Sequence, residues 1–142
     1  MPGEALMAAM QVAALSGVDV RILLSSNSDS FLVKWTVRSY FEDFLEAGVK
    51  IYIYPDGFLH SKVIISDDEL TTIGTANLDI RSFEQNYEVN VLIYEKECTT
   101  KLRQDFLKRC EKSIQINYEE HLKRPKIERL KEGLAKVFSP IL

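Results

Sequence analysis

Cysteine is scarce in this chain, and its two copies form no recognisable metal or disulfide pattern. Cys98 and Cys110 lie twelve residues apart on a predicted helix, without a CxxC pair. His121 does not complete a zinc-binding spacing with them. We therefore expect reduced thiols, as in a cytosolic setting, and we place Cys110 on the apolar stripe of the helix, in the core.

Long hydrophobic runs are also missing. A helix that crosses a bilayer needs roughly 20 apolar residues. The nearest candidate, residues 5–15, is much shorter and is predicted to be a buried helix. The N-terminus shows no pattern of a secretory signal. We expect no transmembrane segment within these 142 residues.

Basic residues are not in excess over the whole chain, whose formal net charge is −3. This acidity argues against nonspecific binding to duplex DNA, so no nucleic-acid partner is expected. The charge is unevenly distributed, because residues 1–95 carry 6 basic and 14 acidic side chains whereas residues 96–142 carry 12 and 7. The basic last third suits either solvated helix faces or an anionic membrane surface.

Composition and periodicity favour one α/β domain over residues 1–142, with 46% hydrophobic residues to build its core. Helix–strand alternation followed by hairpins predicts a mixed central β-sheet with helices on both faces. The expected helices are residues 5–17, residues 29–47, one carrying Leu102, Phe106 and Cys110, and one carrying Ile127, Leu130, Leu134 and Phe138. The expected strands include residues 18–24, 49–53, 58–65 and 87–94, and Pro55-Asp56-Gly57 is predicted to be a turn.

The most informative residues are grouped between positions 60 and 88. In order they are His60, Lys62, Asp67, Gly74, Thr75, Asn77 and Glu88. A strand over residues 58–65 has a period of two, which puts His60 and Lys62 on one face. An imidazole can then reach a phosphorus atom while the neighbouring ammonium holds a non-bridging oxygen. The group contains what is needed to break a phosphodiester.

This spacing resembles the HKD motif of the phospholipase D superfamily, which is His-x-Lys, four residues, Asp, six residues, Gly-Ser or Gly-Thr, one residue and Asn. The chain matches every position, with Thr75 where Ser is commoner. The resemblance implies a phospholipase D-like fold. Residues 77–90, the start at residues 2–6 and the tail at residues 122–142 are further similar to bacterial cardiolipin synthases. By that likeness, residues 1–142 are the second HKD half of a two-motif enzyme.

The resemblance implies catalytic roles for four residues. His60 attacks phosphorus or moves a proton, and Lys62 with Asn77 holds the non-bridging oxygens as charge builds up. Glu88, expected on the next strand, orients the imidazole of His60. Such a site needs no metal or cofactor, because fixed side chains supply the electrostatic stabilisation.

Three further motif residues are expected to support the site. Asp67 lies in a predicted hairpin turn with Asp68 and Glu69, and we expect it to fix the turn rather than to react. Thr75 is expected to donate a hydrogen bond within the site, and Gly74 belongs to the same motif.

The implied reaction needs two histidines, and this chain has one motif, because His121 lacks the HxK context. The second must come from another HKD half or from a homodimer partner. In two-motif enzymes His60 would be the general acid/base, whereas in a homodimer one copy would do each job. The implied substrate is phosphatidylglycerol, and the implied place is the cytoplasmic face of the bacterial inner membrane. A phospholipase D-type hydrolase, a dimeric nuclease and a non-enzymatic docking module are the alternatives.

Overall fold

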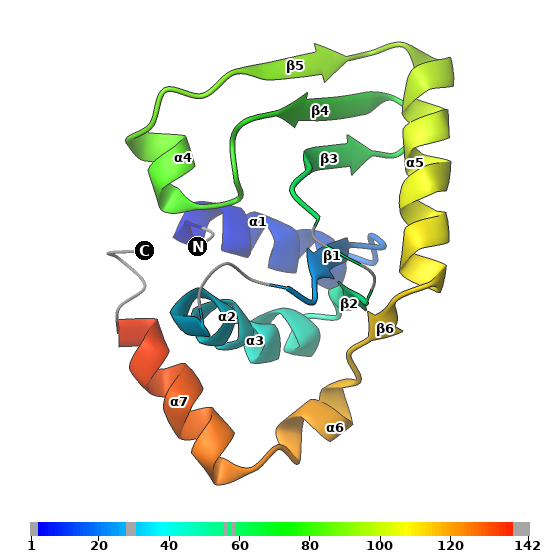
Figure 1. Cartoon of the computed structure of the whole chain (residues 1–142). Helices are drawn as coiled ribbons and strands as arrows, with labels where there is room; N and C mark the ends of the chain where they lie inside the picture. Colours follow the sequence, from blue (N-terminus) through cyan, green and yellow to red (C-terminus); the bar gives the residue numbers. More distant parts are fainter. Residues whose placement is uncertain (1–2, 28–30, 56, 58, 138–142) are drawn as a thin grey trace.

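The structure is a computed structural model that describes residues 3–27, 31–55, 57 and 59–137 (Figure 1). The helices are α1 (Glu4–Leu15), α2 (Phe31–Arg38), α3 (Phe41–Glu46), α4 (Ile80–Glu84), α5 (Lys96–Glu111), α6 (Tyr118–Leu122) and α7 (Lys126–Val137). The strands are β1 (Arg21–Ser25), β2 (Lys50–Tyr54), β3 (Lys62–Ser66), β4 (Leu70–Gly74), β5 (Asn90–Ile93) and β6 (Ile114–Gln115).

The hydrophobic core is built around the first sheet, in which β2 lies between β1 and β6. Strands β1 and β2 run parallel, and β6 pairs antiparallel with β2. Its central cluster consists of Phe41, Phe44, Val49 and Ile51, against which side chains of α1 and α2 pack. Cys110 of α5 is 2% exposed, as expected, and α5 contacts β2. The α/β class and the mixed strand directions are thus confirmed.

The strands do not form one central sheet, contrary to the expectation. Strands β3, β4 and β5 form a separate antiparallel sheet, at the top of Figure 1. Strand β2 is paired on both of its edges, with β1 and β6, and β3 pairs instead with β4. Helix α5 runs beside both sheets and contacts β2, β3, β4 and β6.

Two strands are shorter than predicted, and this moves two site residues out of the sheet. Strand β3 begins at Lys62, because β4 ends opposite it at Gly74 and offers no partner further back. His60 therefore precedes the strand instead of sharing a strand face with Lys62, and the expected start at Phe58 lies outside the described residues. Likewise β5 begins at Asn90, so Glu88 lies before it.

The helix expected over residues 29–47 is two helices, α2 and α3, separated at Ser39 and Tyr40. The hydroxyl of Ser39 donates to the carbonyl of Thr36 at 2.7 Å, a local bond that competes with the helical pattern. Residues 29 and 30 lie outside the described residues, as do Asp56 of the expected turn and Phe138 of the last helix.

Helix α1 ends as expected, because Gly17 follows its C-cap with φ +92°. The prediction that this helix is buried is wrong. Met7 and Met10 pack against the core, whereas Val12 and Leu15 are 62% and 72% exposed. The helix lies outside the cluster of α3 and β2, so only one face is covered. Among the described residues, no helix is both long and apolar enough to cross a bilayer.

Helix α7 docks through its polar face. Glu132 and Ala135 are buried, whereas the apolar side chains of Ile127, Leu130 and Leu134 are exposed.

Arg124 bonds to Glu132 at 2.9 Å and to Glu42 of α3 at 2.8 Å. This ion network attaches the C-terminal helices to α2 and α3, and it leaves an apolar stripe on the surface.

Candidate active site

His60 and Lys62 lie where the chain enters the second sheet. His60 is exposed in the segment before β3, and Lys62 is the first residue of that strand. The Nζ atom of Lys62 donates to the backbone carbonyl of His60 at 3.0 Å. The ammonium therefore lies next to His60 although the two residues do not share a strand face.

Gly74 and Thr75 join the end of β4 to the segment that carries Glu88. The backbone amide of Thr75 donates to the carbonyl of Val89 at 3.0 Å, and the amide of Val89 donates to the hydroxyl of Thr75 at 3.0 Å. A Cβ atom on Gly74 would clash with Val89 and Asn90. The motif glycine thus permits the close approach that brings Glu88 beside Thr75.

Asn77 is positioned by the start of α4. Its backbone amide donates to the hydroxyl of Ser82 at 3.2 Å. Asp79 is the N-cap of α4, and its carboxylate accepts from the amide of Ser82 at 2.7 Å. These bonds hold the turn between β4 and α4, and so fix the backbone from which the Asn77 carboxamide projects.

Glu88 lies in a cluster of hydrogen-bond donors. Hydrogen bonds from the hydroxyls of Thr75 and Ser82 hold the pKa of the Glu88 carboxyl below its usual range, with a smaller contribution from Asn86. The Nδ2 atom of Asn86 lies 3.4 Å from the Glu88 carboxylate. Glu88 is therefore a carboxylate at neutral pH. Its pairing with His60 stays a prediction.

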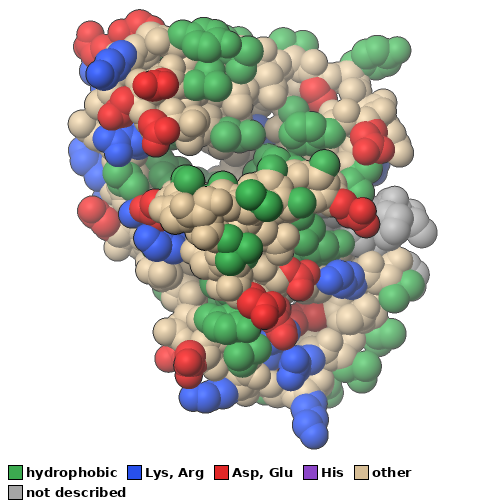
Figure 2. Space-filling model, turned by 180° about the vertical axis from the view of Figure 1, so that it is seen from behind, with side chains coloured by type: hydrophobic (Ala, Val, Ile, Leu, Met, Phe, Trp, Pro, Cys, Tyr) green, Lys and Arg blue, Asp and Glu red, His purple; other side chains and the backbone are tan. Residues whose placement is uncertain are grey.

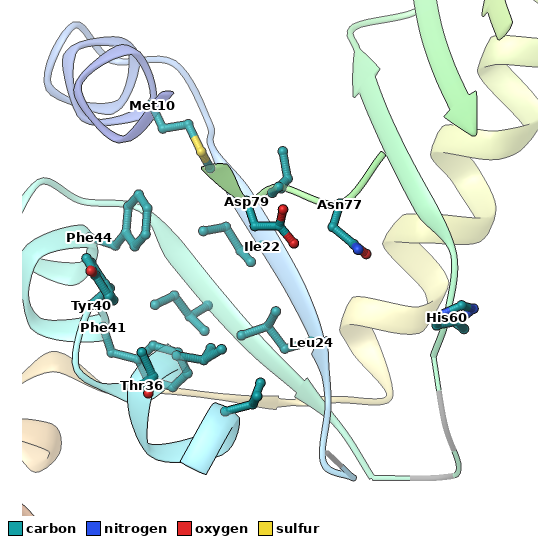
Figure 3. A pocket seen from close by; sticks show the side chains of 14 residues that line it. Met10, Ile22, Leu24, Thr36, Tyr40, Phe41, Phe44, His60, Asn77 and Asp79 are labelled. Atoms are coloured by element: carbon teal, nitrogen blue, oxygen red, sulfur yellow. The ribbon is translucent and has the colours of Figure 1, made fainter. Parts of the chain in front are cut away.

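A cavity of about 440 Å³ brings His60 and Asn77 to one site. In Figure 3 the carboxamide of Asn77 points into the space on whose far side His60 lies, and Asp79 borders the same space. Lys62 lies beside the cavity, because its ammonium bonds to the backbone of His60. Glu88 is connected to the cavity through Ser82, whose hydroxyl bonds both to the Glu88 carboxylate and to the backbone of Asn77. Of the four residues predicted to be catalytic, His60 and Asn77 therefore line the cavity, and Lys62 and Glu88 lie beside them.

Asp67 lies apart from this region, in the turn between β3 and β4, with φ +52°. The neighbouring Asp68 forms a two-pronged pair with Arg103 of α5, at 2.7 and 3.1 Å. The turn therefore fastens the hairpin to α5.

Sequence reasoning missed Ser82 as an individual site residue. Its side chain is 6% exposed, and its hydroxyl connects the backbone of Asn77 to the carboxylate of Glu88. The available signal was its position three residues after Asp79, because the side chain of a helix N-cap accepts a hydrogen bond from the backbone amide there.

Comparison with known proteins gives the family. Residues 1–110 match the family model described as "Cardiolipin synthase, PLD-like domain". The chain belongs to this family. Its fold class and its HKD-type motif agree with that assignment.

Curated relatives match over all 142 residues. Cardiolipin synthases of Geobacillus sp. (strain WCH70) and Clostridium perfringens (strain SM101 / Type A) are 48% and 42% identical to the chain, and the major cardiolipin synthase of Bacillus subtilis (strain 168) is 43% identical. The chain covers 28%, 30% and 30% of these proteins, respectively. It therefore spans less than a third of the length of the relatives it matches.

Solved structures support the fold. Nuc from Salmonella typhimurium, a phospholipase D family member, has a TM-score of 0.68 and 19% identity, with 82% of this chain and 76% of that chain covered. Phosphatidylserine synthase from Haemophilus influenzae has a TM-score of 0.67 and 18% identity, with 99% and 37% covered. At these identities the likeness concerns the fold.

Proposed function

We propose that this chain supplies one half of the active site of a cardiolipin-forming phosphatidyltransferase. Two phosphatidylglycerol molecules react, and the products are cardiolipin and glycerol. The observation that carries the proposal is 42–48% identity to cardiolipin synthases over the full chain, with the HKD-type motif complete. In the proposed reaction the acceptor is a lipid hydroxyl. In the alternative, a phospholipase D-type hydrolase, the acceptor is water.

The side chains divide the chemistry as follows. Lys62 and Asn77 bind the non-bridging phosphate oxygens and stabilise the charge that builds up on them. One histidine attacks phosphorus and forms a phosphohistidine, while the other protonates the departing glycerol oxygen. The second histidine then takes the proton of the acceptor hydroxyl as its oxygen attacks phosphorus, and the bond between phosphorus and the first histidine breaks. His60 is one of these two groups.

Glu88 acts on the imidazole in this proposal. Its lowered pKa keeps it charged, so that it can stabilise an imidazolium and fix one tautomer. Thr75 and Ser82 hold this carboxylate in place. Because these bonds lie within one chain, we expect Glu88 to be already positioned before the second histidine arrives.

Residues 1–142 form a single phospholipase D-like domain in this proposal, and the second histidine comes from another HKD half or from a second copy. An exposed apolar face of the second sheet supports this, since Val63 and Val91 are 37% and 59% exposed and both lie in register with Ile73 of β4. Figure 2 shows hydrophobic side chains gathered at the top of the molecule, where Figure 1 places β5. A partner domain would remove this surface from water.

Both proposed substrates are bilayer lipids, so we place the reaction at a membrane surface. The resemblance to bacterial cardiolipin synthases favours the cytoplasmic face of the inner membrane. The exposed apolar stripe of α7 and the basic last third of the chain are compatible with such a surface.

The test is product analysis. The complete enzyme, with both histidine motifs, is incubated with phosphatidylglycerol vesicles, and the lipids are identified by mass spectrometry. We expect cardiolipin and free glycerol, and the same yield in the presence of excess chelator. Phosphatidic acid as the main product would move the protein to the hydrolase reading. Loss of turnover in chelator, restored by a divalent ion, would contradict the mechanism.

A further inference from the structure

The cavity beside His60 extends far beyond the reacting groups. Its volume of about 440 Å³ lies within the roughly 300–1,000 Å³ of ligand pockets. The phosphate-binding role proposed for Lys62 and Asn77 uses only its rim. The remainder has no part in the chemistry described so far.

The lining of this remainder is mostly apolar, with Thr36 and Tyr40 as its polar members. Side chains from five elements contribute to it, including Met10 of α1, Ile22 and Leu24 of β1, Val37 of α2, Phe44 of α3 and Ile51 of β2. Figure 3 shows Met10 and Phe44 at one end of the cavity and His60 at the other.

Of the polar lining residues, Asn77 lies toward the His60 end and Asp79 lies further in, with its carboxylate accepting from the amide of Ser82. At the inner end the hydroxyl of Thr36 already donates to the carbonyl of Ala135. A ligand that fits both ends needs a phosphate at the rim and a hydrocarbon portion that extends inward. A glycerol headgroup does not fit the inner end, because its hydroxyls would lose their hydrogen bonds with water there.

We propose that this cavity binds a fatty acyl chain of the donor phospholipid. The chain enters from the His60 end, and its methylenes lie between α1, β1 and the α2–α3 pair. This inference rests on the proposed phosphatidyl transfer, because it takes the phosphate at His60 as the anchor of the lipid. Burial of the acyl chain would give the enzyme a preference for long-chain donors.

Met10→Trp tests this, because the larger side chain fills the inner end. The complete enzyme is given dihexanoyl and dioleoyl phosphatidylglycerol as competing donors in the same mixed micelles. Each methylene kept out of an apolar site costs roughly fourfold. We expect the preference for the dioleoyl lipid, measured as a ratio of kcat/KM values, to fall about tenfold or more.

Val12→Trp is the matched control. Val12 lies on the same helix, is 62% exposed and does not line the cavity. We expect this variant to keep the preference of the unmodified enzyme. An equal loss with both donors in Met10→Trp, or the same shift in Val12→Trp, would overturn the inference while leaving cardiolipin formation intact. Absence of cardiolipin from the unmodified enzyme would instead overturn the proposed function.

A second measurement needs no variant. Phosphatidylglycerol with a photoreactive diazirine at the end of one acyl chain is cross-linked to the unmodified enzyme, and the labelled peptides are sequenced. Label on α1, β1 or α2–α3 supports the acyl site. Label confined to β3–β5 or to α7 would contradict it, even if Met10→Trp failed to fold.

Discussion

Gly74 and Asn90 face each other across β4 and β5, and a Cβ atom on Gly74 would lie 2.6 Å from the Cα atom of Asn90. The same close approach lets Val89 and Thr75 exchange two hydrogen bonds. The motif glycine therefore determines where Glu88 lies. Its requirement is steric, since its φ is not in the left-handed region.

Gly74→Ala should force β5 away from β4 and displace Glu88. We expect a loss of about 1–3 kcal/mol in the free energy of unfolding, as for other overpacked positions, together with reduced turnover. Gly133→Ala is the control, because Gly133 is exposed within α7 and a Cβ there meets nothing. It should raise stability by about 0.5–1 kcal/mol. Urea unfolding measures both, and equal effects would refute the steric account.

His60→Asn and Lys62→Ala should each nearly abolish turnover while the fold is retained. Loss of one acid/base group costs about 10²–10⁴-fold. Glu88→Gln should be milder, because it removes charge and orientation but leaves the imidazole. Lys101→Ala serves as the control, because Lys101 is an exposed lysine of α5. If Glu88→Gln unfolds the protein, as seen by circular dichroism, the carboxylate is structural and its proposed pairing with His60 is wrong.

Arg124→Met should destabilise the chain strongly, because Arg124 is the main partner of the buried Glu132 carboxylate. Arg38 still faces Glu132 at 3.3 Å, so we expect about 3 kcal/mol, the low end for a broken buried pair. Arg103→Met removes a partly exposed pair with Asp68 and should cost about 0–1 kcal/mol. Thermal or urea unfolding compares the two. Similar decreases in the free energy of unfolding for the two variants would mean that burial of Glu132 does not determine how much the loss of Arg124 destabilises the chain.

His121 makes stability depend on pH as the pH falls below about 6.5. Burial, and then the charge of Arg124, lower the pKa of His121 below 6.5, and its Nε2 atom is buried without a hydrogen-bond partner among the described residues. The unfolded chain therefore takes up this proton first, so the free energy of unfolding falls as the pH drops below about 6.5.

Urea midpoints at pH 7, 6 and 5 measure this effect. His121→Gln should show a smaller decrease than the unmodified chain. Glu42 does not interfere, because Arg124 lowers the pKa of its carboxyl, and such a group loses stabilisation only as the pH falls below about 4.5. Parallel decreases in the two proteins would contradict this assignment.

The motif residues were predicted from sequence because their spacing alone fixes them. Their secondary structure was predicted less well. Periodicity extended the strand back to Phe58, but a strand ends where its partner ends, and β4 ends at Gly74, opposite Lys62. His60 therefore lies in a connecting segment.

The buried face of a helix was likewise harder to predict than the position of the helix. The apolar spacing of Ile127, Leu130 and Leu134 located α7 correctly, yet the structure buries Glu132 and Ala135 instead. Arg38 and Arg124 lie 94 and 8 residues from Glu132 in the chain. A local sequence pattern cannot predict an ion pair between residues that are 94 positions apart. Ser82 was missed for a similar reason, because its role depends on Glu88 folding back over α4.

The central claim is phosphatidyl transfer through a covalent histidine intermediate, and glycerol exchange tests it most directly. The complete enzyme is incubated with phosphatidylglycerol and ¹³C-labelled glycerol, and the headgroup label in the remaining phosphatidylglycerol is followed by mass spectrometry. A phosphohistidine that returns its phosphatidyl group to glycerol predicts labelled phosphatidylglycerol with the unmodified enzyme and none with His60→Asn. Cardiolipin formation without any label in phosphatidylglycerol, or the same label with His60→Asn, would contradict the account.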